Sequence, residues 1–239
     1  MSNQYFQFKQ FNVRHDRCAM KVGTDGVLLG AWARVERAAT VLDVGTGTGL
    51  IALMAAQRNR TARVVAVELD PEAARQAAEN VQESPWAGRM EVVCADVKHY
   101  EGDCLFDAIV SNPPYYTNSL KSSEARRTAA RHADGLTCAD LLACVKRLLA
   151  DGGEFSVIIP FDASLDFIAE AAGKGLYLVR RTAVRTLAGM PPKRALLAFR
   201  RGLACGPEGI SDDELVIETA GHAYTDDYRR LTGDFYLFF

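Results

Sequence analysis

The hydrophobic positions of this chain form short β-type runs that alternate with helical patterns. The runs predict seven strands, at Thr40–Val44, Arg63–Glu68, Met90–Cys94, Phe106–Ser111, Glu154–Ile159, Leu176–Val184 and Ala195–Arg200. The stretches between them predict helices at Leu50–Arg58, Pro71–Val81, Cys138–Ala150 and Asp162–Ala172. Strands that alternate with helices pair mostly in parallel, with helices on both faces. The pattern therefore predicts an α/β fold with a mostly parallel, seven-stranded sheet.

No linker, repeat or low-complexity tract divides the 239 residues, so we expect a single domain over residues 1–239. Residues 1–35 precede the first strand as an N-terminal extension. Residues 211–239 form a tail whose apolar end, Tyr236–Phe239, we expect to pack on the domain. The composition, 49% hydrophobic and 24% charged, excludes disorder and coiled coil.

Location and metal binding are predicted from what the sequence lacks. The apolar runs fall short of the roughly 20 residues that a membrane-spanning helix needs, and residues 1–13 lack a signal pattern. We therefore expect a cytoplasmic protein without a membrane partner. Six scattered cysteines without C-x-x-C, and four histidines without H-E-x-x-H, predict reduced thiols and no metal site.

A glycine-rich loop follows the first predicted strand and opens a helix. It reads Asp43-Val-Gly45-Thr46-Gly47-Thr-Gly49. Glycines at such a turn allow the backbone to approach a ligand closely. The alternative interpretation is a set of turn glycines that binds nothing.

Two further acidic residues, Glu68 and Asp96, end the second and third predicted strands. A carboxylate at the first of these places can hydrogen-bond ribose hydroxyls, and both belong to the ligand-binding edge of an open α/β sheet. Each could also be a helix cap. Asp43 would repel a pyrophosphate but suits a cationic amino-acid moiety, which favours S-adenosylmethionine over NAD.

The segment Ser111-Asn112-Pro113-Pro114-Tyr115 follows the fourth predicted strand. The Asn112 side chain and the Pro113 carbonyl offer two acceptors for the hydrogens of a planar amino group, and Tyr115 can stack on its ring. These acceptors would hold the nitrogen lone pair toward a methyl donor. The chemistry would be an in-line displacement that depends on positioning and electrostatics, without a metal or a covalent nucleophile.

This pair of motifs resembles the class I methyltransferases that modify planar amino groups. The resemblance implies a Rossmann-like fold, S-adenosylmethionine as cofactor and S-adenosylhomocysteine as product. The segments Phe8–Trp32, Ser84–Trp86 and Asp234–Phe238 are similar to the bacterial tRNA(1)(Val) adenine-37 N6-methyltransferases. That likeness implies methylation of tRNA beside the anticodon. It also implies that the extension borders the cofactor, through Lys21, Thr24 and Asp25.

The charge distribution is compatible with an RNA substrate. Residues 117–201 hold 14 basic and 8 acidic residues, although the whole chain has a net charge of −2. Four basic residues follow Tyr115 closely and are candidates for phosphate contacts: Lys121, Arg126, Arg127 and Arg131. A solvated face of mixed charge is the alternative. We expect a monomer or a weak dimer.

Three rival functions stay open. Glutamine-N5 methylation of a release factor, or amino methylation of ribosomal RNA or DNA, would use the same motifs on another acceptor. An RNA-binding module with a degenerate cofactor pocket is opposed by the intact acidic residues and by Asn112–Tyr115. An NAD oxidoreductase is opposed by Asp43 and by glycine spacing that differs from G-x-G-x-x-G.

Overall fold

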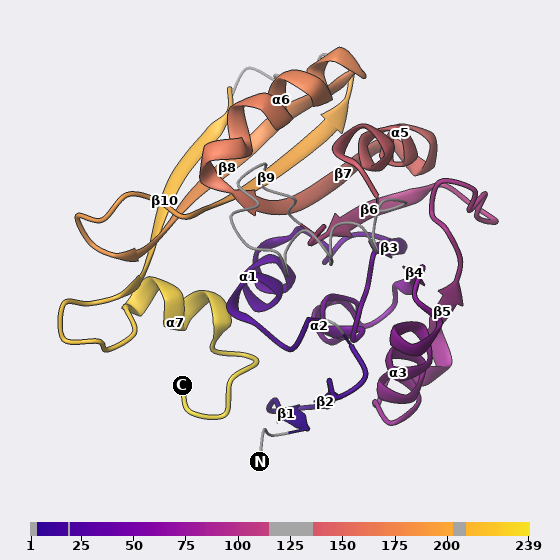
Figure 1. Cartoon of the computed structure of the whole chain (residues 1–239), viewed down its shortest axis with the longest axis horizontal. Helices are drawn as coiled ribbons and strands as arrows, with labels where there is room; N and C mark the ends of the chain where they lie inside the picture. Colours follow the sequence, from indigo (N-terminus) through magenta and orange to yellow (C-terminus); the bar gives the residue numbers. More distant parts are fainter. Residues whose placement is uncertain (1–3, 19, 115–135, 203–208) are drawn as a thin grey trace, which may run out of the picture.

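A central sheet of eight strands forms the core of the computed structural model, which describes residues 4–18, 20–114, 136–202 and 209–239. The strands run in the order β10-β8-β9-β7-β6-β3-β4-β5 (Figure 1). Their bounds are β3 Thr40–Val44, β4 Arg63–Glu68, β5 Met90–Cys94, β6 Phe106–Ser111, β7 Leu149–Pro160, β8 Leu176–Leu187, β9 Arg194–Arg201 and β10 Ser211–Glu218.

The helices cover both faces of this sheet (Figure 1). Their bounds are α1 Thr24–Trp32, α2 Leu50–Arg58, α3 Pro71–Gln82, α5 Cys138–Leu148, α6 Ser164–Gly173 and α7 Asp226–Thr232, with short 3₁₀ turns at Ala87–Arg89 and Phe161–Ala163. A separate antiparallel hairpin joins β1, Tyr5–Gln7, to β2, Asn12–Arg14. The predicted α/β class with a mostly parallel sheet is confirmed.

Two hydrophobic layers separate the sheet from its helices. Val64 of β4 points into the layer shared with α1, α2 and α7, and the next residue, Val65, points into the layer shared with α5 and α6. Both valines are fully buried. This alternation explains why the strands read as continuous apolar runs, because a sheet covered on both faces buries every position.

The strand register brings four loops together at one edge of the sheet. Val44 at the end of β3 lies opposite Val67 of β4 and Ser111 of β6, and Glu68 lies opposite Cys94 of β5. These strands are parallel, so the loops that follow them all start at the same carboxyl edge. The motifs found in the sequence occupy these loops.

The strand count is a correction to the prediction: the described part of the sheet has eight strands, not seven. The eighth, β10, lies in the segment interpreted as a tail and pairs in parallel with β8. Only Leu215 of β10 is buried, so the strand lacks the apolar alternation that would have identified it. Ion pairs from β8 hold it: Arg185 with Glu214 at 2.6 Å, and Arg181 with Asp212.

The first and last segments of the described chain lie side by side (Figure 1). The Lys9 ammonium donates to the carbonyls of Gly233 (2.6 Å) and Phe239 (3.0 Å). Phe8 and Phe235 are almost fully buried in one cluster with residues of α1, α2 and α3. Both segments therefore pack on the helices that cover one face of the sheet.

Candidate active site

A pocket of about 460 Å³ opens at the carboxyl edge of β3, β4, β5 and β6. The glycine loop, the loops after β4 and β5, and the end of β6 each contribute to its wall. The lining residues that carry the argument are Cys18, Met20, Gly45, Gly47, Glu68, Asp70, Asp96, Lys98, Asn112 and Pro113. Its volume lies within the usual range for small-molecule sites.

The glycine loop requires glycine at the two positions that face this pocket. Gly45 and Gly47 have φ angles of +69° and +56°, in the left-handed region that other residues rarely adopt. Both residues line the pocket, and a Cβ added to either would meet no atom within 4 Å. The loop therefore presents bare backbone to whatever occupies the pocket.

Asp43 lies beneath this loop, fully buried, and does not line the pocket. Its Oδ2 accepts hydrogen bonds from the Thr46 hydroxyl (2.6 Å) and from the Ala52 N–H in the first turn of α2 (3.1 Å). The side chain thus caps α2, whose N-cap residue is a glycine without a side-chain cap. Its other oxygen, Oδ1, is buried without a partner among the described residues.

Burial sets the protonation of Asp43. Desolvation raises the pKa of this carboxyl to about 7, although the bonds from Thr46 and Ala52 oppose the shift. A buried carboxyl that changes charge near neutral pH is uncommon. This carboxyl holds the glycine loop against the start of α2 through Thr46 and Ala52.

Glu68 is held by the loops on either side of it. Its Oε2 accepts from the Gly47 N–H (2.8 Å) and its Oε1 from the Asp70 N–H (3.0 Å). Asp70 itself caps α3 by accepting from the N–H groups of Glu72 and Ala73, both at 2.9 Å. One carboxylate thus fixes the glycine loop relative to the start of α3.

Asp96 shapes the wall above β5. Its Oδ1 accepts from the Lys98 N–H (2.9 Å), and its Oδ2 lies 3.4 Å from the Lys98 ammonium. Among the described lining residues, three carboxylates (Glu68, Asp70 and Asp96) accompany this one ammonium. An acidic wall favours a cationic ligand with hydroxyl groups over a pyrophosphate. The sequence analysis based this preference on Asp43, which is buried outside the lining, so Glu68, Asp70 and Asp96 are its basis in the structure.

The Asn112–Pro113 segment is placed by the preceding residue. The Ser111 hydroxyl, fully buried, donates to the Val44 carbonyl at 2.9 Å and so ties the end of β6 to the end of β3. Asn112 and Pro113 follow at once and line the pocket, half-buried. The structure thus brings them together with Gly45, Gly47, Glu68 and Asp96. Other candidates lie outside the described residues: Tyr115, Lys121, Arg126, Arg127 and Arg131.

The segment before α1 meets the pocket at residues that the sequence did not single out. Cys18 and Met20 line it, whereas Lys21 does not, and Thr24 lines a second cavity. Burial, together with the charges of Glu68 and Asp70, raises the pKa of the Cys18 thiol to about 11. The thiol therefore stays protonated at neutral pH and is a poor nucleophile.

Two buried amides of α3, which the sequence analysis missed, hold this segment in place. Asn80 accepts from the Arg14 N–H and donates to the Arg14 carbonyl, both at 2.9 Å, and also donates to the Thr48 carbonyl at 2.8 Å. Gln76 accepts from the Arg17 N–H (3.2 Å) and donates to Asp16 (2.7 Å). One sequence signal could have revealed them. Gln76 and Asn80 are four residues apart and lie on the helix face that buries Ala73 and other apolar side chains.

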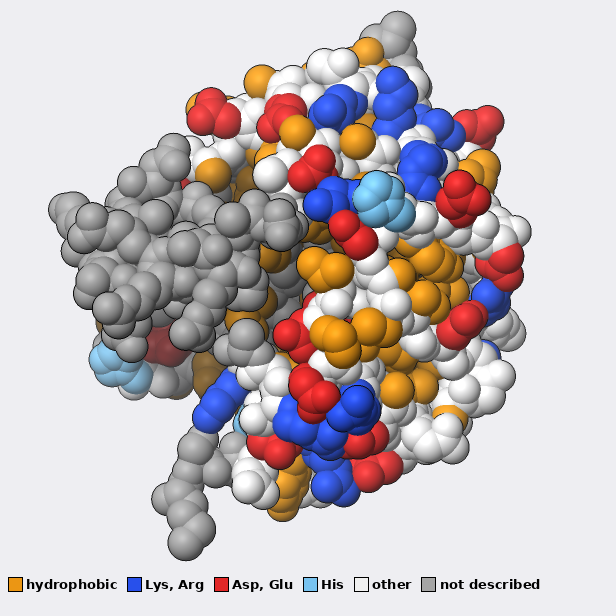
Figure 2. Space-filling model, turned by 45° about the vertical axis from the view of Figure 1, so that its right-hand side comes forward, with side chains coloured by type: hydrophobic (Ala, Val, Ile, Leu, Met, Phe, Trp, Pro, Cys, Tyr) orange, Lys and Arg blue, Asp and Glu red, His pale blue; other side chains and the backbone are white. Residues whose placement is uncertain are grey.

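The exposed charges on the α3 and β5 side of the molecule are mostly paired. Figure 2 shows lysine and arginine side chains next to aspartate and glutamate side chains on this face. Arg14 pairs with Glu83 at 2.9 Å, and Arg63 pairs with Glu91 at 2.9 Å. On the described part of this face, the basic side chains are therefore interspersed with acidic ones.

In the described ranges no group of three or more histidine, cysteine, aspartate or glutamate side chains is arranged to hold a metal ion. No helix in the same part of the chain is both long and apolar enough to cross a membrane.

Comparison with known proteins identifies the family. Residues 22–166, which contain the glycine loop, Glu68, Asp96 and Asn112, match the methyltransferase small domain family. The chain is 51% identical over 240 residues to the tRNA1(Val) (adenine(37)-N6)-methyltransferase of Bacteroides fragilis, with 99% of each chain covered. The chain belongs to this methyltransferase family. A relative of the same description from Aeromonas hydrophila is 48% identical over 236 residues, with 98% of each chain covered.

Solved structures support the fold of this methyltransferase. A chain described as a predicted O-methyltransferase from Agrobacterium tumefaciens superposes with a TM-score of 0.70 at 22% identity, covering 88% of this chain and 96% of its own. At that identity the likeness shows the fold alone. Together with the family match, it confirms the predicted Rossmann-like methyltransferase fold. The full-length relatives confirm the resemblance to the tRNA(1)(Val) adenine-37 N6-methyltransferases that the sequence showed at Phe8–Trp32, Ser84–Trp86 and Asp234–Phe238.

Proposed function

We propose that this protein transfers the methyl group of S-adenosylmethionine to the exocyclic N6 of an adenine in tRNA, at position 37 of a valine tRNA. The names of its full-length relatives support the substrate. The single observation that carries the chemistry is the position of Asn112 and Pro113 on the wall of the pocket that also holds the glycine loop, Glu68 and Asp96.

The pocket fits this cofactor. S-adenosylmethionine carries a positive sulfonium and a positive ammonium, and its methyl group is the electrophile of the reaction. The acidic wall suits those charges, and Glu68, fixed at the end of β4, is placed to accept from ribose hydroxyls. Gly45 and Gly47 leave room for the ligand to lie against the backbone. We assign Asp96 to the adenine end of the same ligand.

Asn112 and Pro113 would hold the target nitrogen. An aromatic amino group is a weak nucleophile because its lone pair is delocalised into the ring. The Asn112 amide oxygen and the Pro113 carbonyl would accept its two N–H groups and direct the lone pair at the methyl carbon. Tyr115 would replace the stacking that the adenine loses when it leaves its neighbours. The cofactor roles of Lys21, Thr24, Asp43 and Thr46, and the phosphate contacts after Tyr115, stay predictions.

An Asn112→Ala variant tests this assignment. It removes one acceptor that acts only on the target nitrogen, so methyl transfer should fall roughly 100- to 1000-fold, the usual cost of one well-placed catalytic hydrogen bond. The dissociation constant for S-adenosylmethionine, measured by calorimetry, should change little. Asn12→Ala, at an exposed asparagine of β2, is the matched control. Normal turnover with weakened cofactor binding would contradict the role given to Asn112.

A further inference from the structure

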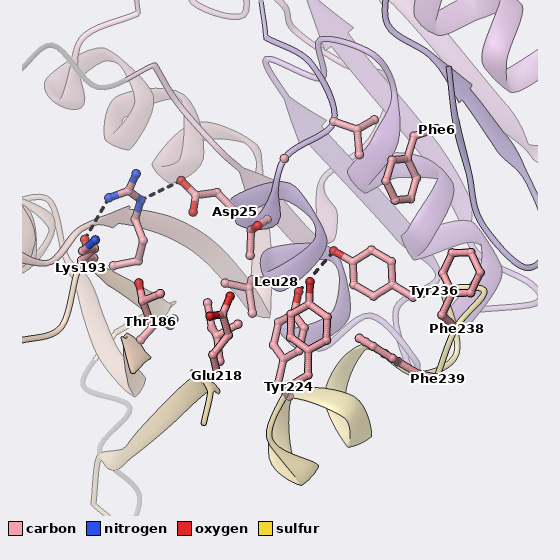
Figure 3. A pocket seen from close by; sticks show the side chains of 17 residues that line it. Phe6, Asp25, Leu28, Thr186, Lys193, Glu218, Tyr224, Tyr236, Phe238 and Phe239 are labelled. Carbon is pink, nitrogen blue, oxygen red and sulfur yellow. Dashed lines mark hydrogen bonds and ion pairs between the residues drawn. The ribbon is translucent and has the colours of Figure 1, made fainter. Parts of the chain in front are cut away.

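A second cavity, of about 560 Å³, opens at the carboxyl edge of the other half of the sheet (Figure 3). It lies where β8 and β10 end and β9 begins. One wall is aromatic and is built by residues after β10, and the other carries polar and charged side chains. Among the residues given a role in the methyl transfer, only Thr24 and Asp25, whose cofactor roles stay predictions, line this cavity.

Both cavities open at the carboxyl edge of the sheet. β8 and β10 are parallel to β6, because β9 is antiparallel to both β7 and β8. Residues 20–25 also join them, since Met20 lines the first cavity while Thr24 and Asp25 line the second. β8 is three strands from β6, about 14 Å at the usual strand spacing. A stacked strand of nucleic acid, at about 3.4 Å per nucleotide, covers that distance in about four nucleotides.

The aromatic wall is a set of rings that hold one another in place. Tyr224 stacks on Tyr228 with ring centroids 5.1 Å apart and meets Phe239 edge-on at 5.0 Å. The Tyr228 hydroxyl donates to the Tyr236 hydroxyl at 3.3 Å. Tyr224 is nevertheless 42% exposed, and Phe238, which lines the same cavity, is 92% exposed. Tyr224 is thus held by its neighbours with part of its ring exposed, and Phe238 adds an exposed ring outside this set of contacts. Exposed aromatic surface of this kind is suited to stacking a planar ligand.

The opposite wall defines the charge of that ligand. In Figure 3, Lys193 and Thr186 lie across the cavity from Tyr224 and Phe239, with Asp25 above and Glu218 below. The Asp25 carboxylate is engaged by Arg194 at 2.7 Å. Lys193 is exposed and lines this wall. Two carboxylates, Asp25 and Glu218, and two cations, Lys193 and Arg194, line the cavity, and Asp25 and Arg194 pair with each other. The aromatic wall is therefore no acidic cage for a methylated amine, and Lys193 can contact an anionic group.

We propose that this cavity binds a second nucleotide of the same RNA, a few positions away from the target adenine. Its base stacks on the exposed aromatic wall at Phe238, and Lys193 on the opposite wall contacts a phosphate of the same strand. This inference rests on the proposed function for its RNA, and it adds that the enzyme reads a splayed stretch of single strand rather than one flipped base.

Two variants with matched controls test the inference. Phe238→Ala and Lys193→Ala change exposed side chains of the cavity. Leu237→Ala is the control for the first, because Leu237 is 42% exposed but lies outside the cavity lining, and Lys146→Ala, on exposed Lys146 of α5, is the control for the second. The thermal midpoints of all four should match that of the wild type.

Binding and kinetics are then measured on unmodified valine tRNA. Loss of one base–aromatic stack predicts roughly 5- to 150-fold weaker RNA binding by Phe238→Ala. The KM for tRNA should rise, whereas kcat and the affinity for S-adenosylmethionine should stay unchanged. Lys193→Ala should weaken binding and lower its salt dependence. In an anticodon stem-loop carrying 2-aminopurine near the target, one position should be quenched by the wild type and by Leu237→Ala but not by Phe238→Ala.

The result separates the two claims. If the wild type methylates no RNA, the proposed function fails whatever the variants do. If it methylates tRNA but Phe238→Ala and Lys193→Ala bind RNA as their controls do, the inference about the second cavity is overturned and the proposed function stands.

Discussion

Asn80 connects the stability of this protein to its cofactor pocket. Its amide makes three hydrogen bonds and is 1% exposed, and two of the bonds fasten Arg14, four residues before Cys18 at the pocket. Asn80→Ala leaves the N–H and carbonyl of Arg14 and the carbonyl of Thr48 without this partner. We expect both the fold and the affinity for S-adenosylmethionine to weaken.

The structure sets the size of the effect. Each net hydrogen bond contributes about 1 kcal/mol, so three lost bonds predict a fall of about 3 kcal/mol in the free energy of unfolding. For a chain of this length that corresponds to a thermal midpoint lower by roughly 6–12 °C. Looser anchoring of Cys18 and Met20 should raise the dissociation constant for the cofactor as well.

Urea denaturation and calorimetry measure the two effects. Glu83→Ala is the control, because it removes a different contact to Arg14, an exposed ion pair at 2.9 Å worth at most about 1 kcal/mol. The reasoning is refuted if Asn80→Ala costs no more than Glu83→Ala, or if it unfolds more easily yet binds the cofactor as tightly as the wild type.

Two further predictions concern charge. Folding raises the pKa of Asp43 to about 7, so between pH 5 and pH 7 the folded protein binds more protons than the unfolded chain. As the pH rises through this range, Asp43 should lower the free energy of unfolding by about 1.4 kcal/mol per pH unit. Asp43→Asn should remove that slope in denaturation curves, and an unchanged slope would contradict the assignment. Arg126→Ala with Arg127→Ala should lower the salt slope of tRNA binding by about 1.4 to 1.8, and an equal slope would exclude them as phosphate contacts.

The sequence predicted the centre of this fold well because its strands are buried on both faces. Arg63–Glu68 and Phe106–Ser111 appear with the bounds that their apolar runs indicated. β10 was missed because ion pairs and a partner strand stabilise it, and neither leaves a periodic signal in the chain. The predicted helix over Cys138–Ala150 ends earlier, at Leu148, because Leu149 already pairs with Phe106 of β6.

The candidate site was predictable where it depends on loops at strand ends. Glu68, Asp96 and Asn112 meet in one pocket because parallel strands end at one edge, which the topology alone implies. Cys18 and Met20 reach the pocket only because of the path that the chain takes before α1. The buried amides of α3, Gln76 and Asn80, determine that path. Nothing local in that segment specifies the path. The burial of Asp43 likewise follows from packing of α2 over β3, which spacing along the chain does not encode.

The central claim is tested most directly by identifying the methylated product. The protein is incubated with labelled S-adenosylmethionine and, in parallel, unmodified tRNA, ribosomal RNA, duplex DNA and a release factor, and each acceptor is digested and analysed by mass spectrometry. The account predicts N6-methyladenosine in tRNA alone, at position 37 of valine tRNA. Methylglutamine in the release factor, or label only in ribosomal RNA or DNA, would contradict it.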